Sequence, residues 1–249
     1  MSRKRPNWKN IGLAVLSLTL MVFAIVSIVK TVGKEERETC SKIVVSVMDS
    51  GDLRFVTATE VEKLIIAKYP KIIGMPDKAI DTKKIETLLK KDPVIKKAEC
   101  YFLPSGDLGV KVWQRHPVMR LFGDENCYVD SEGKKFPLSN NYIAYVPIVT
   151  GTVNKDMLGG KLTDFMTYIS KDEFWSAEIQ QVDVAQDGNI KIVPTFGDHI
   201  IEFGNIENYD RKLKKLKTFY VNGLNKIGWG DYKTVNVEYD KQVVCTKEE

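Results

Sequence analysis

The sequence contains none of the common motifs of catalytic or cofactor sites. It has no glycine-rich phosphate loop, no dinucleotide fingerprint, and no serine or cysteine in a nucleophile elbow beside a plausible base. Histidine is scarce: a zinc site would need both His116 and His199 together with distant ligands. We therefore expect no cofactor, no metal, no small-molecule substrate and no enzymatic activity.

Cysteine is also sparse and irregularly spaced. The chain has four, with no CxxC pair and no spacing typical of a disulfide framework: Cys40, Cys100, Cys127 and Cys245. In an oxidising compartment several pairings are open, because pairing requires a geometry that the sequence does not specify. The simpler interpretation is that the cysteines are buried apolar groups.

Acidic residues are absent from the first 30 positions, which hold five basic ones: Arg3, Lys4, Arg5, Lys9 and Lys30. The whole chain has 37 basic and 33 acidic residues, so the part beyond position 30 is close to neutral. Composition therefore indicates no basic face for nucleic acid. With 43% hydrophobic and 28% charged residues, the chain is also not of a disordered or collagen-like class.

Residues 11–29 form one long uncharged run, which predicts a transmembrane helix. A helix of this length spans about 28 Å, similar to the hydrocarbon core of a bilayer. A buried helix would show a polar face, and a cleaved signal peptide would have a shorter apolar stretch with a small-x-small site. The basic residues before the run predict a cytoplasmic N-terminus by the positive-inside rule.

The rest of the chain is predicted to form two abutting folded units outside the inner (plasma) membrane. The pattern of elements changes near 115–117, and no repeat or low-complexity linker separates the units. The expected segments are a cytoplasmic tail (1–10), a transmembrane helix (11–29), a juxtamembrane linker (30–41), a first domain (42–116), a β domain (117–246) and a tail (247–249).

The first unit is predicted to have the element order β-α-α-β-β. A strand over 43–48 is followed by a helix that begins with a Thr57/Glu60 capping box, and Asp81 is the N-cap of a second helix. Two strands follow over 94–102 and 108–114. Two helices on one face of a small sheet make a domain with a modest core.

The second unit is predicted to be a mainly antiparallel β domain with two flanking helices, so the fold class is α+β. An amphipathic helix near 158–169 is followed by a hairpin around Asp187-Gly188, and a later helix spans about 207–221. The later helix carries Lys212, Lys214, Lys215 and Lys217 on its outer face, interpreted as solvated or as facing an acidic partner. The expected strands are 118–122, 127–130, 134–138, 146–150, 179–185, 190–194, 199–203, 234–239 and 242–246.

Asp130 and Glu132 are the best candidates for an acid–base pair, for example in a peptidoglycan-active enzyme. The simpler interpretation is structural, because Asp, Ser and Gly between two short strands are typical of a turn. His116 lies beside Pro117 and is interpreted as a residue that hydrogen-bonds the backbone. The enzyme hypothesis stays open as the alternative function.

Several short motifs in fixed order resemble the FtsQ/DivIB family of bacterial cell-division proteins. They cover about 1–246 and include 92–98 and 103–112 in the first unit, the Arg115-His116-Pro117-Val118 junction, and the Tyr128-Val129-Asp130 hairpin with Gly133 and Phe136. Val146-Pro147-Ile148-Val149-Thr150-Gly151, Phe203-Gly204 and the closing strands 235–239 and 243–244 complete the pattern.

The resemblance implies a POTRA domain next to the membrane and a non-enzymatic role in the divisome. Members of the family bridge early and late division proteins, bind FtsB in complex with FtsL, and communicate with the septal peptidoglycan synthase FtsW–FtsI. The resemblance therefore implies a single-pass inner-membrane protein, enriched at the division septum, with periplasmic or other extracytoplasmic domains.

The last strands of the second unit are the predicted partner-binding site. In the family they receive a segment of FtsB, and a C-terminal strand at a sheet edge offers unpaired N–H and C=O groups for strand addition. An inner strand or a frayed tail is the alternative. The candidate partner-binding residues are Tyr239, Lys241, Gln242, Val243, Val244 and Cys245.

Overall fold

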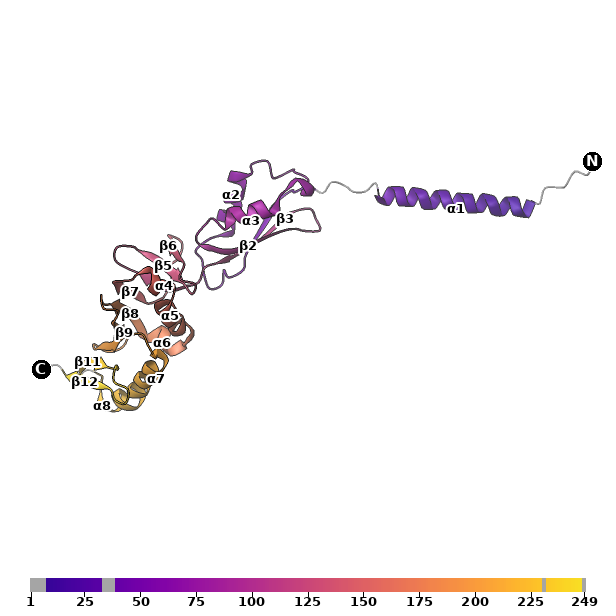
Figure 1. Cartoon of the computed structure of the whole chain (residues 1–249). Helices are drawn as coiled ribbons and strands as arrows, with labels where there is room; N and C mark the ends of the chain where they lie inside the picture. Colours follow the sequence, from indigo (N-terminus) through magenta and orange to yellow (C-terminus); the bar gives the residue numbers. More distant parts are fainter. Residues whose placement is uncertain (1–7, 33–38, 230–231, 248–249) are drawn as a thin grey trace, which may run out of the picture.

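A computed structural model describes residues 8–32, 39–229 and 232–247 (Figure 1). Helix α1 (Trp8–Val32) covers the predicted span 11–29. The helix is exposed at position 12 and at positions 15–27. No helix in the described part of the chain combines the length and the hydropathy that a membrane crossing requires. Positions 1–7, 33–38 and 248–249 of the predicted tails and linker lie outside the described residues.

The first unit has the predicted order of elements. Strand β1 (Ile43–Val47) is followed by α2 (Ala58–Lys68), a short 3-10 turn η1 (Asp77–Ala79) and α3 (Thr82–Leu89). Strands β2 (Ile95–Phe102) and β3 (Leu108–Gln114) complete a sheet in the order β1-β3-β2. Strand β3 lies in the middle, parallel to β1 and antiparallel to β2, so β1 and β2 form the two edges.

Local sequence signals explain where the two main helices of this unit begin. The Thr57 side chain accepts from the N–H of Glu60, and Glu60 accepts from the N–H of Thr57, which is the predicted capping box. Asp81 accepts from the N–H of Lys84 at the start of α3. Ile65, Leu89 and other apolar side chains of the helices then pack on the sheet to form the core of the unit.

The second unit contains a nine-stranded sheet in the order β12-β11-β10-β9-β8-β7-β4-β5-β6. Two of the predicted strands, 127–130 and 190–194, have the predicted ends, the other seven have one or both ends shifted by at most three residues, and all nine are present. They are β4 (Pro117–Leu121), β5 (Cys127–Asp130), β6 (Lys135–Pro137), β7 (Ile148–Gly151), β8 (Ile179–Val184), β9 (Ile190–Pro194), β10 (Ile200–Gly204), β11 (Tyr232–Asn236) and β12 (Val244–Lys247).

The sheet is mixed: five of its eight neighbouring pairs are antiparallel, in line with the predicted majority, but the prediction did not include the parallel pairs. Three of its eight neighbouring pairs, β4–β7, β7–β8 and β10–β11, are parallel. Each of these parallel pairs requires a crossover connection. The connections β7–α4–α5–α6–β8 and β10–α7–β11 supply two of them with helices, which explains why helices flank this sheet.

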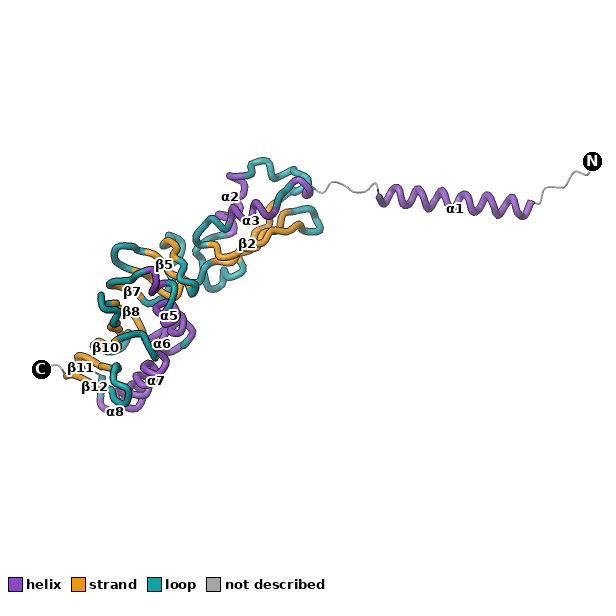
Figure 2. Tube along the Cα trace, viewed as in Figure 1, coloured by secondary structure: helices purple, strands orange, loops and turns teal. Residues whose placement is uncertain are grey.

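The prediction of two flanking helices was too simple. The first predicted helix, near 158–169, corresponds to the end of α4 (Lys155–Leu158) and most of α5 (Lys161–Lys171). A further short helix, α6 (Glu173–Glu178), follows it and begins at the N-cap Asp172. The second, α7 (Tyr209–Phe219), continues into a π-helical turn η2 (Tyr220–Leu224) and α8 (Asn225–Ile227). Figure 2 shows α5, α6 and α7 along one side of the strands.

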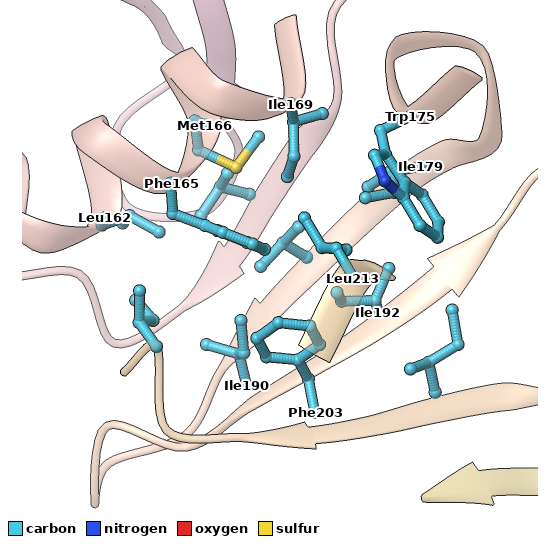
Figure 3. Packing of buried hydrophobic residues seen from close by; sticks show 14 of the residues in the cluster. Leu162, Phe165, Met166, Ile169, Trp175, Ile179, Ile190, Ile192, Phe203 and Leu213 are labelled. Atoms are coloured by element: carbon cyan, nitrogen blue, oxygen red, sulfur yellow. The ribbon is translucent and has the colours of Figure 1, made fainter. Parts of the chain in front are cut away.

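The core of the second unit lies between these helices and the sheet. Phe165 of α5 packs against Phe203 of β10, with ring centroids 5.3 Å apart. The apolar face of α5 points towards β9 and Leu213 of α7, as Figure 3 shows for Leu162, Met166, Ile169, Ile190 and Ile192. The apolar residues of the predicted helix are all buried: Leu158, Leu162, Phe165, Met166 and Ile169.

A third apolar cluster joins the two units. The Phe55 ring contacts the rings of Tyr128, Phe136 and Tyr142, with centroids 5.4, 5.7 and 5.0 Å away. The segment between β6 and β7 adds polar contacts: Asn141 Nδ2 donates to the Glu60 carboxylate at 3.0 Å. The two units therefore share a packed interface at the β5–β6 end of the large sheet, and β12 lies at its opposite end (Figure 1).

Candidate partner-binding edge

The six predicted partner-binding residues lie together on the β11–β12 hairpin at the end of the large sheet. Tyr239, Lys241 and Gln242 belong to the connection between the two strands, and Val243 directly precedes β12. Val244 and Cys245 are the first two residues of β12. Tyr239 and Val244 are exposed, whereas Val243 and Cys245 are half-buried and pack against the core of the second unit.

Strand β12 pairs only with β11 among the described strands, so its other side is a sheet edge. The N–H of Val237 donates to Glu202 O of β10 at 3.0 Å, so the odd-numbered residues of β11 face β10 and the even-numbered ones face β12. Asn236 therefore exchanges hydrogen bonds with Val244. It follows that Cys245 directs its N–H and C=O away from the sheet.

No other group in the described chain bonds to this outer row. Among the described residues, the backbone of 244–246 has no hydrogen bond beyond its ladder with β11. The Cys245 side chain points into the unit while its backbone faces outward, so the strand is held in place without its edge being covered. Such an edge can accept an added strand.

Two lysines of α7 bond to backbone carbonyl groups at this end of the sheet. Lys215 Nζ donates to Val237 O at 2.8 Å and also to Tyr239 O, both beyond the end of β11, and so holds the hairpin in position. Lys212 Nζ donates to Phe203 O, near the end of β10, at 3.1 Å and to Asn205 O, just beyond it, at 2.8 Å.

The interpretation of the α7 lysines as solvated or as facing a partner was therefore wrong for Lys212 and Lys215, because both bond to backbone carbonyl groups of the chain. Desolvation lowers the pKa of both Lys212 and Lys215; the Asp240 carboxylate opposes this effect at both lysines, and the Glu238 carboxylate opposes it at Lys212. Lys217 lies 3.7 Å from Asp172 and above the Phe174 ring. Lys214 alone remains simply exposed.

A groove of about 580 Å³ runs beside the hairpin, between it and the end of α7. One wall carries the predicted residues Lys241, Gln242 and Val243, and the opposite wall is formed by Lys215, Thr218, Phe219, Asn222 and Gly223. The π-helical turn shapes this wall, because it turns Tyr220 into the core and leaves Asn222 and Gly223 on the groove side. The groove therefore adds a partly apolar surface next to the open edge of β12.

A buried pair of polar side chains, His199 and Tyr220, lies in the core beside the hairpin region. His199 Nε2 lies 2.7 Å from the Tyr220 hydroxyl, and both side chains are almost completely buried. Burial lowers the pKa of His199 and raises the pKa of Tyr220, so both groups are held neutral. Trp229 packs on the Tyr220 ring and closes this side of the core.

Asp130 and Glu132 are not arranged as an acid–base pair. Asp130 is buried: its Oδ1 accepts from the N–H groups of Glu132 and Lys134, both at 2.9 Å, and its Oδ2 accepts from Arg115 at 2.6 Å. Glu132 is exposed and pairs with Lys96 of β2 at 2.8 Å. The turn therefore ties the second unit to the first, which is the structural interpretation of this motif.

Comparison with protein families supports the same division into two units. A POTRA-like domain matches residues 38–113, and the family described as FtsQ/DivIB, C-terminal related, matches residues 116–246. The second match covers more than half of the chain. The chain belongs to the FtsQ/DivIB C-terminal-related family. No curated protein matches the chain.

The family and the POTRA-like region suggest a role related to cell division and are consistent with a non-catalytic protein. The resemblance to FtsQ/DivIB is therefore confirmed at the level of relatedness. Among the described residues no group of three His, Cys, Asp or Glu side chains is placed to hold a metal ion. The partner-binding role of the hairpin stays a prediction.

Two smaller expectations need correction. His116 does not bond the backbone; its Nε2 lies 3.3 Å from the Asp49 carboxylate, and its ring is largely exposed.

The cysteines are all unpaired, but only Cys40 is fully buried, and the other three are half-buried. Burial raises the pKa of the Cys100 thiol to about 12 and also raises the pKa of the Cys127 and Cys245 thiols, so they remain protonated.

Sequence reasoning missed the lysine contacts and the groove. A helical pattern identifies which side of α7 is polar, but it does not identify which strand ends lie beside that side. The second helix was predicted to end near 221, whereas it continues through a π-helical turn that contains Gly223. The signal available in the sequence was the density of lysines on one face, which is compatible with both interpretations.

Proposed function

We propose that the chain is a non-enzymatic scaffold of the division septum whose β12 edge accepts a strand from an FtsB/FtsL-type complex. The observation that carries the proposal is the outward-facing backbone of Cys245, on a terminal strand whose ladder with β11 is intact. Membership of the FtsQ/DivIB C-terminal-related family supports the same role.

The partner segment is expected to be extended and to alternate apolar with polar side chains. Main-chain hydrogen bonds to Val243 and Cys245 supply affinity, because these residues direct their backbone groups outward. Side chains on one face of the added strand then meet the groove beside Phe219 and Gly223, and those on the other face meet the exposed Val244. The groove supplies specificity, since unpaired edge groups alone bind any extended chain.

The proposal also places this scaffold at the inner (plasma) membrane. Support comes from the uncharged run 11–29, from the basic residues before it, and from the helix α1 that extends over this run. The N-terminus is then cytoplasmic, and the POTRA-like unit and the β domain lie outside, at the septum. There the scaffold bridges early and late division proteins and helps to control septal peptidoglycan synthesis by FtsW–FtsI.

Proline substitution at two adjacent residues tests strand addition. Cys245→Pro removes an outward N–H and leaves the β11–β12 ladder bonds in place, so we expect about tenfold or greater loss of affinity for the FtsB/FtsL-type complex. The measurement is titration of the membrane-reconstituted full chain with the purified complex. Circular dichroism and the thermal midpoint report whether the fold is kept.

Thr246→Pro is the matched control, because its N–H faces β11 and belongs to the ladder. This variant should lose stability, whereas Cys245→Pro should lose binding first. Val243→Pro, which removes the preceding outward N–H, should weaken binding in the same direction. If Cys245→Pro and Val243→Pro bind the complex as well as the parent does, strand addition at β12 is ruled out.

A further inference from the structure

The outer edge of the first sheet has a row of backbone groups that can be assigned from the ladder. The N–H of Leu103 donates to Asp107 O at 2.9 Å at the end of the β2–β3 hairpin. Hydrogen-bonded and non-hydrogen-bonded pairs alternate from there, so Cys100 opposite Val110 and Ala98 opposite Val112 form non-hydrogen-bonded pairs. Ala98 and Cys100 therefore direct their N–H groups away from β3, to the free edge.

A side chain closes this edge at its centre. The N–H of Cys100 donates to Glu86 Oε1 at 2.9 Å, and Glu86 reaches the edge from α3. The bond consumes an edge donor that an incoming strand would need, and it places a negative charge in the path of that strand's carbonyl oxygens. Closer to the second unit, Lys96 of β2 is held by Glu132 at 2.8 Å.

The side chains of β2 are self-complementary in one antiparallel register. Lys97 and Glu99 lie on the sheet face away from the helices and are bonded to each other at 2.7 Å. If two copies of β2 met antiparallel with Ala98 opposite Ala98, the outward Ala98 groups would form a hydrogen-bonded pair. The same register would place Lys97 of each copy opposite Glu99 of the other, and opposite charges in facing positions stabilise a pair of strands.

That register also requires the outward Cys100 N–H as a donor to the second copy. The Glu86 carboxylate occupies this donor in the single chain. We propose that Glu86 keeps the β2 edge closed against a second copy of this chain, and that without this contact two chains pair through β2. Glu86 is thus a specificity-determining residue that acts by blocking an unwanted strand pairing.

The experiment compares Glu86→Ala with Glu86→Gln in the full chain in detergent micelles. Sedimentation velocity over a range of concentrations should show a shift towards dimer for Glu86→Ala, with a dissociation constant at least about tenfold lower than that of the parent. Glu86→Gln keeps an acceptor for the Cys100 N–H and should behave as the parent does. Hydrogen exchange should show new protection of the Ala98 amide in the Glu86→Ala dimer.

A charge exchange separates this pairing from any other association. Lys97→Glu added to Glu86→Ala places like charges opposite each other and should reverse the dimerisation, and further addition of Glu99→Lys should restore it. A Glu86→Ala protein that associates no more than the parent would overturn the proposal. So would a dimer that ignores the Lys97 and Glu99 charges or leaves the Ala98 amide unprotected.

Discussion

At the outer edge of the first sheet, the N–H of Cys100 donates to the Glu86 carboxylate. At the end of the second sheet, the equivalent outward N–H of Cys245 has no partner among the described residues. Both edges belong to strands of an antiparallel hairpin, β2–β3 and β11–β12. They differ in the contact that the neighbouring helix makes. Helix α3 places the Glu86 carboxylate on its edge, whereas α7 places Lys215 on the connection between β11 and β12 and leaves the outer side of β12 uncovered.

The comparison indicates that whether an edge is open or closed depends on specific side chains of the neighbouring helix. Edge strands invite unwanted pairing, and proteins usually shorten, charge or cover them. The remaining edge of the large sheet follows that rule, since β6 has only three residues and ends in Pro137. Strand β12 is also short, with four residues, but its outer backbone stays uncovered while Val243 and Cys245 pack against the core. An uncovered edge that is anchored by core contacts fits strand addition.

The largest expected effect comes from removing the support beneath the open edge. Phe165→Ala empties the middle of the second core and should lower the free energy of unfolding of that unit by about 3–5 kcal/mol. Because the sheet that carries β12 packs on this core, hydrogen-exchange protection in β11 and β12 should fall as well. Urea unfolding and hydrogen exchange measure the two effects.

Ile65→Ala in the first core is the matched control for this comparison. Ile65 is also fully buried, and its truncation should cost about 2–5 kcal/mol in the first unit. Protection of β11 and β12 should then change little, because β12 lies at the end of the large sheet remote from the shared cluster. Equal loss of protection in β12 for both variants would contradict the separation of the two cores.

A smaller effect is expected at the junction that joins the closed edge to the second unit. Asp130→Asn keeps an acceptor for the turn N–H groups but leaves Arg115 with the exposed Glu132 carboxylate, 3.8 Å away, as its remaining charged partner, at a cost of about 3 kcal/mol. Thermal unfolding measures this loss. Zymography on peptidoglycan separates the structural role from the enzyme hypothesis: hydrolysis by the parent that disappears in Asp130→Asn would contradict the structural interpretation.

The smallest effect should follow from loosening the open hairpin directly. Lys215→Met removes the donor to Val237 O and Tyr239 O and should cost about 1–2 kcal/mol, with faster amide exchange in 237–242 and weaker partner binding. Lys214→Met is the control on the exposed side of α7, with an expected change within about 0.5 kcal/mol. If both variants behave alike, the lysine contacts do not hold the edge.

Local patterns predicted local structure well. The Thr57/Glu60 capping box, the Asp81 cap and the hairpin around Asp187-Gly188 are where the sequence placed them, because a cap or a tight turn depends on residues within a few positions of one another. The prediction of a helix near 158–169 missed the break between α4 and α5 and the short helix α6, although Asp172 is a typical N-cap.

Contacts between distant segments were the part that prediction missed. The parallel pairs of the large sheet, the carbonyl contacts of Lys212 and Lys215, and the Glu86 bond to Cys100 all join residues far apart in the chain or on different elements. A periodic pattern shows that a strand exists and which face is apolar. It does not show which strand lies beside it.

The amino-acid sequence by itself determined the order of the elements, their caps and turns, and the two apolar cores, since each follows from the side chains of a short segment. Only the tertiary structure decided that β12 lies at the end of a nine-stranded sheet, that its outer backbone stays uncovered, and that the β2 edge is closed by Glu86. The reason is physical: the state of an edge depends on which neighbours pack beside it, and packing is a property of the whole fold.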